Sequence, residues 1–168
     1  IIEKREPFTL SATTANFNDA PLSNGGTICQ EVEGDFVVMC RFDDMEGYRD
    51  HSAKSYNDGG LLIADADGTF FQLGVFPLYN CGNIFTILSK DGRPQYPNFK
   101  GYDADPILQF ERRGDLLFAR TSRDGKTWRN MPGSPVSLSG GKIGIGTYQT
   151  TYSDNPSWVR LSNFIIYQ

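Results

Sequence analysis

The residues best suited to hold a ligand lie close together in the stretch Thr150–Trp158 of this 168-residue chain. These nine residues contain two aromatic side chains, Tyr152 and Trp158, among several short polar groups. Sugar rings stack their apolar C–H faces on aromatic rings, and their hydroxyl groups pair with amides, carboxylates and guanidinium groups. We therefore predict that Tyr152 and Trp158 stack on a sugar. The nearest polar candidates for hydroxyl contacts are Asp154, Asn155 and Arg49.

The same nine residues also fit a purely structural role. Asn155-Pro156 is a typical turn dipeptide. A Trp beside such a turn can be half buried and close the end of a domain. The sequence leaves the ligand site and the structural lid as two open interpretations.

Catalytic carboxylates are harder to place. A glycosidase needs two carboxyl groups about 5–5.5 Å apart for retention or about 6.5–9.5 Å apart for inversion. Glu31 and Glu111 are the glutamates that fall on predicted strands, and solvated strand faces explain both. His51 is the only histidine, and no Gly-x-Ser-x-Gly nucleophile motif is present. We therefore assign no catalytic residue, and a glycoside hydrolase with an unrecognised carboxylate pair is the alternative function.

Two aspartate-glycine motifs are interpreted as turns. Ser122-Arg123-Asp124-Gly125-Lys126-Thr127-Trp128 nearly matches the Asp-box of sialidases but occurs once, so we expect Asp124 to cap backbone amides. Asp65-Ala66-Asp67-Gly68 resembles the start of a calcium loop, yet the twelfth residue from Asp65 is Phe76 instead of the required Glu. No cofactor is assigned, and a calcium ion held by scattered aspartates and carbonyl groups stays open.

The elements that must position these residues are short strands. Runs rich in β-branched and aromatic residues alternate with Gly and Asx-Gly pairs that favour hairpin turns. The predicted strands are Gly26–Val32, Asp35–Asp43, Gly59–Ala64, Thr69–Phe76, Asn83–Leu88, Ile107–Arg112, Asp115–Thr121, Lys142–Tyr148 and Ser157–Tyr167. This pattern predicts an all-β fold, a two-sheet antiparallel jelly-roll sandwich that forms a single domain over residues 1–168.

Two hairpins can be written in register. With Gly114-Asp115 as the turn, Leu108, Phe110 and Arg112 share one strand face. A two-residue turn at Gly34-Asp35 places four residues on the core face of the second strand. These residues are Phe36, Val38, Cys40 and Phe42.

The three cysteines give a weak indication of pairing. The Gly34-Asp35 register places Cys29 opposite Cys40, at a separation that a disulfide can span, so this bridge stays open. Cys81 is predicted to be unpaired. The odd count without a Cys-x-x-Cys motif argues against a zinc site.

Several stretches resemble the concanavalin A-like lectin/glucanase superfamily. They are Gly34–Met39, Asp58–Ile63, Ser122–Trp128 and Ile143–Gly146. The likeness extends from Ile28 to Tyr167 and is strongest to the accessory sandwich module at the C-terminus of family 43 β-xylosidases and to related bacterial modules of unassigned function. The resemblance implies a concanavalin A-like sandwich. Many glucanases of this fold carry Glu-x-Asp-x-x-Glu on one strand, whereas Glu33-Gly34-Asp35-Phe36-Val37-Val38 lacks the last Glu.

Composition limits the partners. The formal charge is −4 and the isoelectric point about 4.9, which argues against nucleic acid, and no apolar run is long enough to span a membrane. The chain begins at Ile1 without Met, so we expect a trimmed sequence whose export signal lay upstream. The expected function is an extracytoplasmic (periplasmic, cell-surface or secreted) module that binds a polysaccharide or oligosaccharide without catalysis, or that accompanies a catalytic domain.

Overall fold

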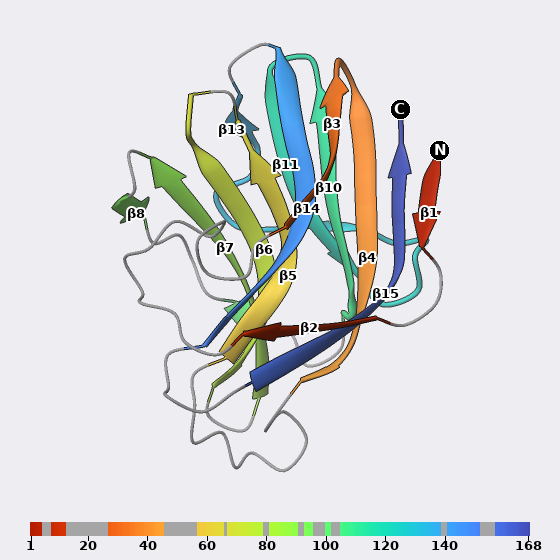
Figure 1. Ribbon diagram of the computed structural model, residues 1–168, viewed down its shortest axis with the longest axis vertical. Coiled ribbons are helices and arrows are strands. Elements are labelled where there is room, and N and C mark those ends of the chain that lie inside the picture. The colour runs from red at the N-terminus through yellow and green to blue at the C-terminus, as the bar shows by residue number, and fades with distance from the viewer. Residues whose placement is uncertain are drawn as a thin grey trace.

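The computed structural model describes residues 1–4, 8–12, 27–45, 57–65, 67–78, 81–90, 93–95, 100–101, 105–138, 141–151 and 157–168. These residues form two antiparallel sheets that face each other, and none of them is helical (Figure 1). The prediction of an all-β, two-sheet antiparallel sandwich is therefore confirmed.

Sheet A has the strand order β1-β15-β4-β10-β11-β12, with β2 also paired to β15 and β13 to β11. Its strands are β1 (Ile2–Lys4), β2 (Phe8–Ala12), β4 (Phe36–Met45), β10 (Ile107–Arg113), β11 (Leu116–Ser122), β12 (Arg129–Asn130), β13 (Val136–Ser137) and β15 (Ser157–Tyr167). In Figure 1 the N-terminal strand β1 lies beside the C-terminal end of β15, with which it pairs.

Sheet B has the order β3-β14-β5-β6-β7-β8, with β9 also paired to β7. Its strands are β3 (Thr27–Glu33), β5 (Asn57–Ala64), β6 (Phe70–Leu78), β7 (Cys81–Lys90), β8 (Arg93–Gln95), β9 (Lys100–Gly101) and β14 (Lys142–Thr151). Every long strand matches a predicted one to within three residues at each end. Six short strands were not predicted from the sequence, because a strand of a few residues shows no measurable periodicity. They are β1, β2, β8, β9, β12 and β13.

The core lies between the two sheets. Alternate residues of β4 point inward, so Phe36, Val38, Cys40 and Phe42 are all buried, as predicted. They meet inward-facing residues of sheet B in one apolar cluster. The sheet B members of this cluster include Leu61, Ile63, Leu73, Val75, Ile84, Ile143 and Ile145.

The predicted pairing across Gly34-Asp35 is wrong. Strand β3 pairs with β14 in sheet B, whereas β4 pairs with β10 and β15 in sheet A, so these two residues cross between the sheets. Gly34 has a positive φ of 80°, which a glycine adopts without steric cost. Asp35 Oδ1 accepts the Gly114 N–H at 2.8 Å, which ties the crossing to the β10–β11 turn.

The predicted placement of Cys29 opposite Cys40 is wrong for the same reason. Leu108, not Cys29, is the cross-strand partner of Cys40. Cys40 is a free, buried thiol, and burial raises the pKa of this thiol far above its usual range. Because β3 and β4 belong to different sheets, the strand pairing that would place Cys29 opposite Cys40 does not form. The side chains of Cys29 and Cys81 lie outside the described residues, and the unpaired state of Cys81 stays a prediction.

The β10–β11 hairpin is confirmed. Arg113 pairs with Leu116 across the Gly114-Asp115 turn, and Leu108, Phe110 and Arg112 are all buried. Arg112 is charged but points inward at the rim of the core. Its Nε donates to the carbonyl of Gly114 at 2.9 Å and its Nη1 to that of Gly141 at 3.2 Å, which compensates for the lost water contacts.

Both aspartate-glycine motifs form turns, as predicted. In the first, Asp124 Oδ1 accepts the N–H groups of Lys126 and Thr127, both at 2.8 Å. Ser122 Oγ accepts the N–H of Gly125 at 2.9 Å. In the second, Asp67 Oδ1 accepts the Thr69 N–H at 2.8 Å and closes the β5–β6 turn.

Replacing Phe36 with alanine should remove a large part of the core. Phe36 is 3% exposed, so Phe36→Ala should lower the free energy of unfolding by roughly 3–5 kcal/mol. Urea unfolding measures this loss, with Leu116→Ala as the control because Leu116 is 41% exposed. A loss below about 1 kcal/mol for Phe36→Ala would contradict the assignment of the core face.

The Asp124 turn should weaken in acid. The N–H groups of Thr127 and then Lys126 lower the pKa of the Asp124 carboxyl below its ordinary value. A carboxyl group with a lowered folded-state pKa stabilises above its unfolded-state pKa, and the contribution disappears as the pH falls through the lowered value. In urea unfolding, the stability difference between wild type and Asp124→Asn should therefore shrink as the solution is acidified. A difference independent of pH would contradict this role.

Candidate functional site

Four strand ends meet at one end of the sandwich, which we call the loop end. Strand β4 ends at Met45 beside Val159 of β15, and β14 ends at Thr151 beside Asn57 of β5. Residues 46–56 therefore connect sheet A to sheet B at this end, and residues 152–156 connect them in the opposite direction. In Figure 1 the first residues of β5 and β15 lie together at the lower end of the molecule.

The predicted ligand residues belong to these two connections. Arg49 lies within residues 46–56, and Tyr152, Asp154 and Asn155 lie within residues 152–156. All four fall outside the described residues, so their part in a site stays a prediction. The described strand ends nevertheless show that both connections start and finish at the loop end.

Trp158 is the predicted site residue that the structure describes. It is half buried in β15, next to Val159, whose side chain is fully buried in the core. Because side chains alternate along a strand, Trp158 and Arg160 both point away from the core. The guanidinium carbon of Arg160 lies 5.5 Å from the centroid of the Trp158 ring, a cation–π contact.

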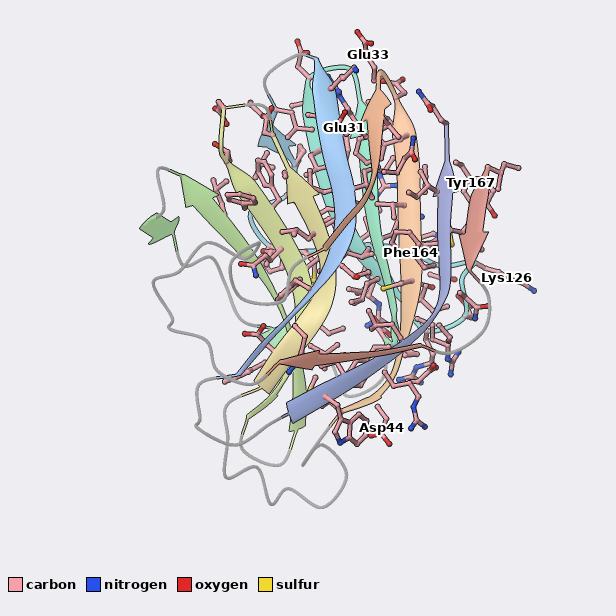
Figure 2. The ribbon with its side chains drawn as sticks, viewed as in Figure 1. Glu31, Glu33, Asp44, Lys126, Phe164 and Tyr167 are labelled. Carbon is pink, nitrogen blue, oxygen red and sulfur yellow. The ribbon has the colours of Figure 1, made fainter. Side chains whose placement is uncertain are left out.

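Asp44 is a further charged group that the structure describes at the loop end. It is the cross-strand partner of Arg160, and its Oδ1 accepts the Met45 N–H at 3.0 Å. Figure 2 shows Asp44 at the lower end of the molecule, far from Glu31 and Glu33 at the upper end. The loop end thus presents an indole ring, a guanidinium group and a carboxylate within two neighbouring strands.

A separate apolar cluster lies on the outer face of sheet B. Leu62, Phe76 and Tyr148 alternate with core residues and form a separate buried cluster, against which Phe70 packs. A Cβ atom on Gly74 would lie 2.1 Å from Tyr148 Oη, so only glycine leaves room for this ring.

Two polar side chains, Asp58 and Gln72, are buried on the same outer face. Neither this pair nor the Tyr148 cluster was expected from the sequence. The glycines inside the predicted strands, at positions 60 and 74, are the signal that could have indicated a close approach there.

The structure does not bring the two candidate carboxylates together. Glu31 points outward from sheet B, and Glu111 points outward from sheet A, on the opposite side of the sandwich. The Glu111 carboxylate forms ion pairs with Arg113 and Arg120. Both guanidinium groups also lie over the Phe118 ring, so Glu111 belongs to a structural cluster.

The described residues contain no group of three His, Cys, Asp or Glu side chains that could hold a metal ion. His51 lies outside the described residues. A search of the described part of the chain for a helix able to cross a membrane found none.

Comparison with protein-family profiles finds no match, and comparison with curated protein sequences finds none either. Solved structures do match. The GH43 BlXynB protein from Bacillus licheniformis aligns with a TM-score of 0.68 at 12% identity, over 94% of this chain and 32% of that chain. A functionally unknown protein from Saccharomyces cerevisiae aligns with a TM-score of 0.66 at 14% identity, over 96% and 87%.

A legume lectin-like domain from Entamoeba histolytica also matches, with a TM-score of 0.52 at 13% identity, over 83% of this chain and 76% of that domain. Together with the two facing antiparallel sheets, these similarities show that the chain has a concanavalin A-like fold. The chain corresponds to about a third of the length of the GH43 protein and to most of the yeast protein.

Removing the charge of Glu111 should destabilise the fold. Glu111→Gln leaves Arg113 and Arg120 without their carboxylate, which should lower the free energy of unfolding by about 1–3 kcal/mol. Glu31→Gln is the control, since Glu31 is exposed and should change stability by less than about 0.5 kcal/mol. Equal urea midpoints for the two variants would contradict the structural role of Glu111.

Proposed function

We propose that this chain is a noncatalytic carbohydrate-binding module. The proposal is supported by a fold shared with a GH43 protein and with a legume lectin-like domain. The observation that carries it is the arrangement of the loop end. Both connections that hold the predicted ligand residues are anchored there, next to the half-buried ring of Trp158.

The chemistry of the loop end suits a sugar. An indole ring offers an apolar face for the C–H groups of a pyranose, and carboxylate and guanidinium groups at its edge pair with hydroxyl groups. Asp44 and Arg160 supply these groups from the described strands. Tyr152, Asp154, Asn155 and Arg49 would add a second ring and further polar contacts.

The absence of catalysis is the second part of the proposal. Two features support it: the neutralisation of Glu111 by two arginines and the position of Glu31 on the other side of the sandwich. A hydrolytic pair needs both carboxyl groups at one scissile bond. The Glu31–Glu111 pair therefore does not support a hydrolase.

We also propose that the module works outside the cytoplasm, where polymeric glycans are found, and beside a catalytic domain. The match to about a third of the GH43 protein supports the second point. Sequencing of the complete gene tests both, because an export signal and a hydrolase domain would be read directly. A complete gene that encodes neither would contradict both.

Affinity electrophoresis in gels containing plant or host polysaccharides tests glycan binding. Trp158→Ala and Tyr152→Ala should abolish retardation, because each removes a stacking ring. Trp128→Ala is the matched control, since Trp128 is also half buried but lies at the β11–β12 turn.

Each variant is also checked by its melting temperature. Unchanged retardation with a large fall in melting temperature for Trp158→Ala would overturn the binding role and leave a structural lid. A wild-type protein that is retarded by none of the polysaccharides would overturn the proposed function.

A further inference from the structure

Arg160 differs from the other arginines in its contacts. Most arginine side chains that the structure describes have an oxygen acceptor. Arg41 pairs with Asp43, Arg113 and Arg120 pair with Glu111, Arg129 pairs with Asp105, and Arg112 donates to two backbone carbonyls. Within the described part of the chain, Arg160 forms no ion pair or hydrogen bond, and its contact is the ring of Trp158.

The stacked arrangement prepares Arg160 for a ligand. The side chain is exposed, so its N–H groups are open to solvent. Contact with the indole ring restricts the orientation of the planar guanidinium, which reduces the entropy lost when a ligand binds. A guanidinium group held in this way can donate two parallel hydrogen bonds to a carboxylate.

We propose that Trp158 and Arg160 form a carboxylate-binding subsite and that the glycan bound at the loop end contains uronic acid. This inference rests on the glycan-binding function proposed above and names its ligand class. The indole ring contacts the apolar face of the sugar, while Arg160 pairs with its carboxylate. A neutral pyranose would offer no carboxylate to pair with the guanidinium group of Arg160.

Asp44 limits the affinity of this subsite. It is the cross-strand partner of Arg160, so its negative charge repels the carboxylate of a ligand that binds Arg160. Neutralising Asp44 should therefore strengthen the binding of an acidic glycan relative to that of a neutral one. A plain stacking site without charge recognition predicts no such difference.

The test measures dissociation constants by isothermal titration calorimetry at low ionic strength. The probes are oligogalacturonate, glucuronic acid-substituted xylo-oligosaccharide, the unsubstituted xylo-oligosaccharide and a sulfated oligosaccharide. The proposal expects an acidic oligosaccharide to bind more tightly than its neutral counterpart, and expects added salt to weaken this preference. A sulfated probe that binds more tightly than both uronate probes would overturn the assignment to a carboxylate.

The variants are Arg160→Gln, Arg160→Lys and Asp44→Asn, with Arg41→Gln as the matched control. Arg41 is an exposed arginine on the neighbouring strand β4, and its carboxylate partner is Asp43. Arg160→Gln should weaken uronate binding by about tenfold, and Arg160→Lys should weaken it less. Asp44→Asn should strengthen it, and Arg41→Gln should change it by less than about twofold.

The outcomes separate this inference from the function on which it rests. Equal affinity for acidic and neutral probes, unchanged by Arg160→Gln, would overturn the uronate subsite and leave glycan binding intact. Failure of the wild-type protein to bind any probe or any polysaccharide would overturn both. If Arg160→Gln does not fold, Arg160→Lys and the salt dependence of the wild-type protein decide the question.

Discussion

Two sheets can enclose one core only if each long strand turns its apolar residues toward the opposite sheet. This requirement determines where the remaining side chains point. Val159 is fully buried between the sheets, so its neighbours Trp158 and Arg160 must both point outward. Their stacking, and with it the proposed recognition of an acidic sugar, depends on the burial of one valine.

The same requirement explains how much of the fold could be predicted from the sequence. Alternation along β4 and β10 is a local property. The predicted core face of β4 was correct, and Leu108, Phe110 and Arg112, which were predicted to share one face of β10, are all buried. The pairing at Gly34-Asp35 was wrong because a tight turn serves equally well for a hairpin and for a crossing between sheets. The choice is made by partners distant in the chain, since β3 pairs with β14 of sheet B instead of β4.

The candidate site, like the fold, could be predicted from the sequence only in part. The aromatic and polar composition of residues 150–158 predicted a ligand site, which stays a prediction, and the strands that flank this stretch end at the same end of the sandwich as those that flank residues 46–56. Arg160 was missed although alternation along the predicted strand already placed it on the same face as Trp158. Asp44 could not be found, because its place opposite Arg160 depends on a register shift between β15 and β4 that no local pattern reveals.

The order of strands in the sheets also bears on how the chain folds during synthesis. Strand β14 lies between β3 and β5, and β15 lies between β1 and β4, so the two last long strands complete both sheets. Among the described strands, β3 has no partner until residues 142–167 have left the ribosome, and β4 and β5 each have one unpaired edge. Such edges invite pairing with other chains. Both sheets can therefore close only after residues 142–167 have been synthesised, and non-local strand pairing of this kind is intrinsically slow.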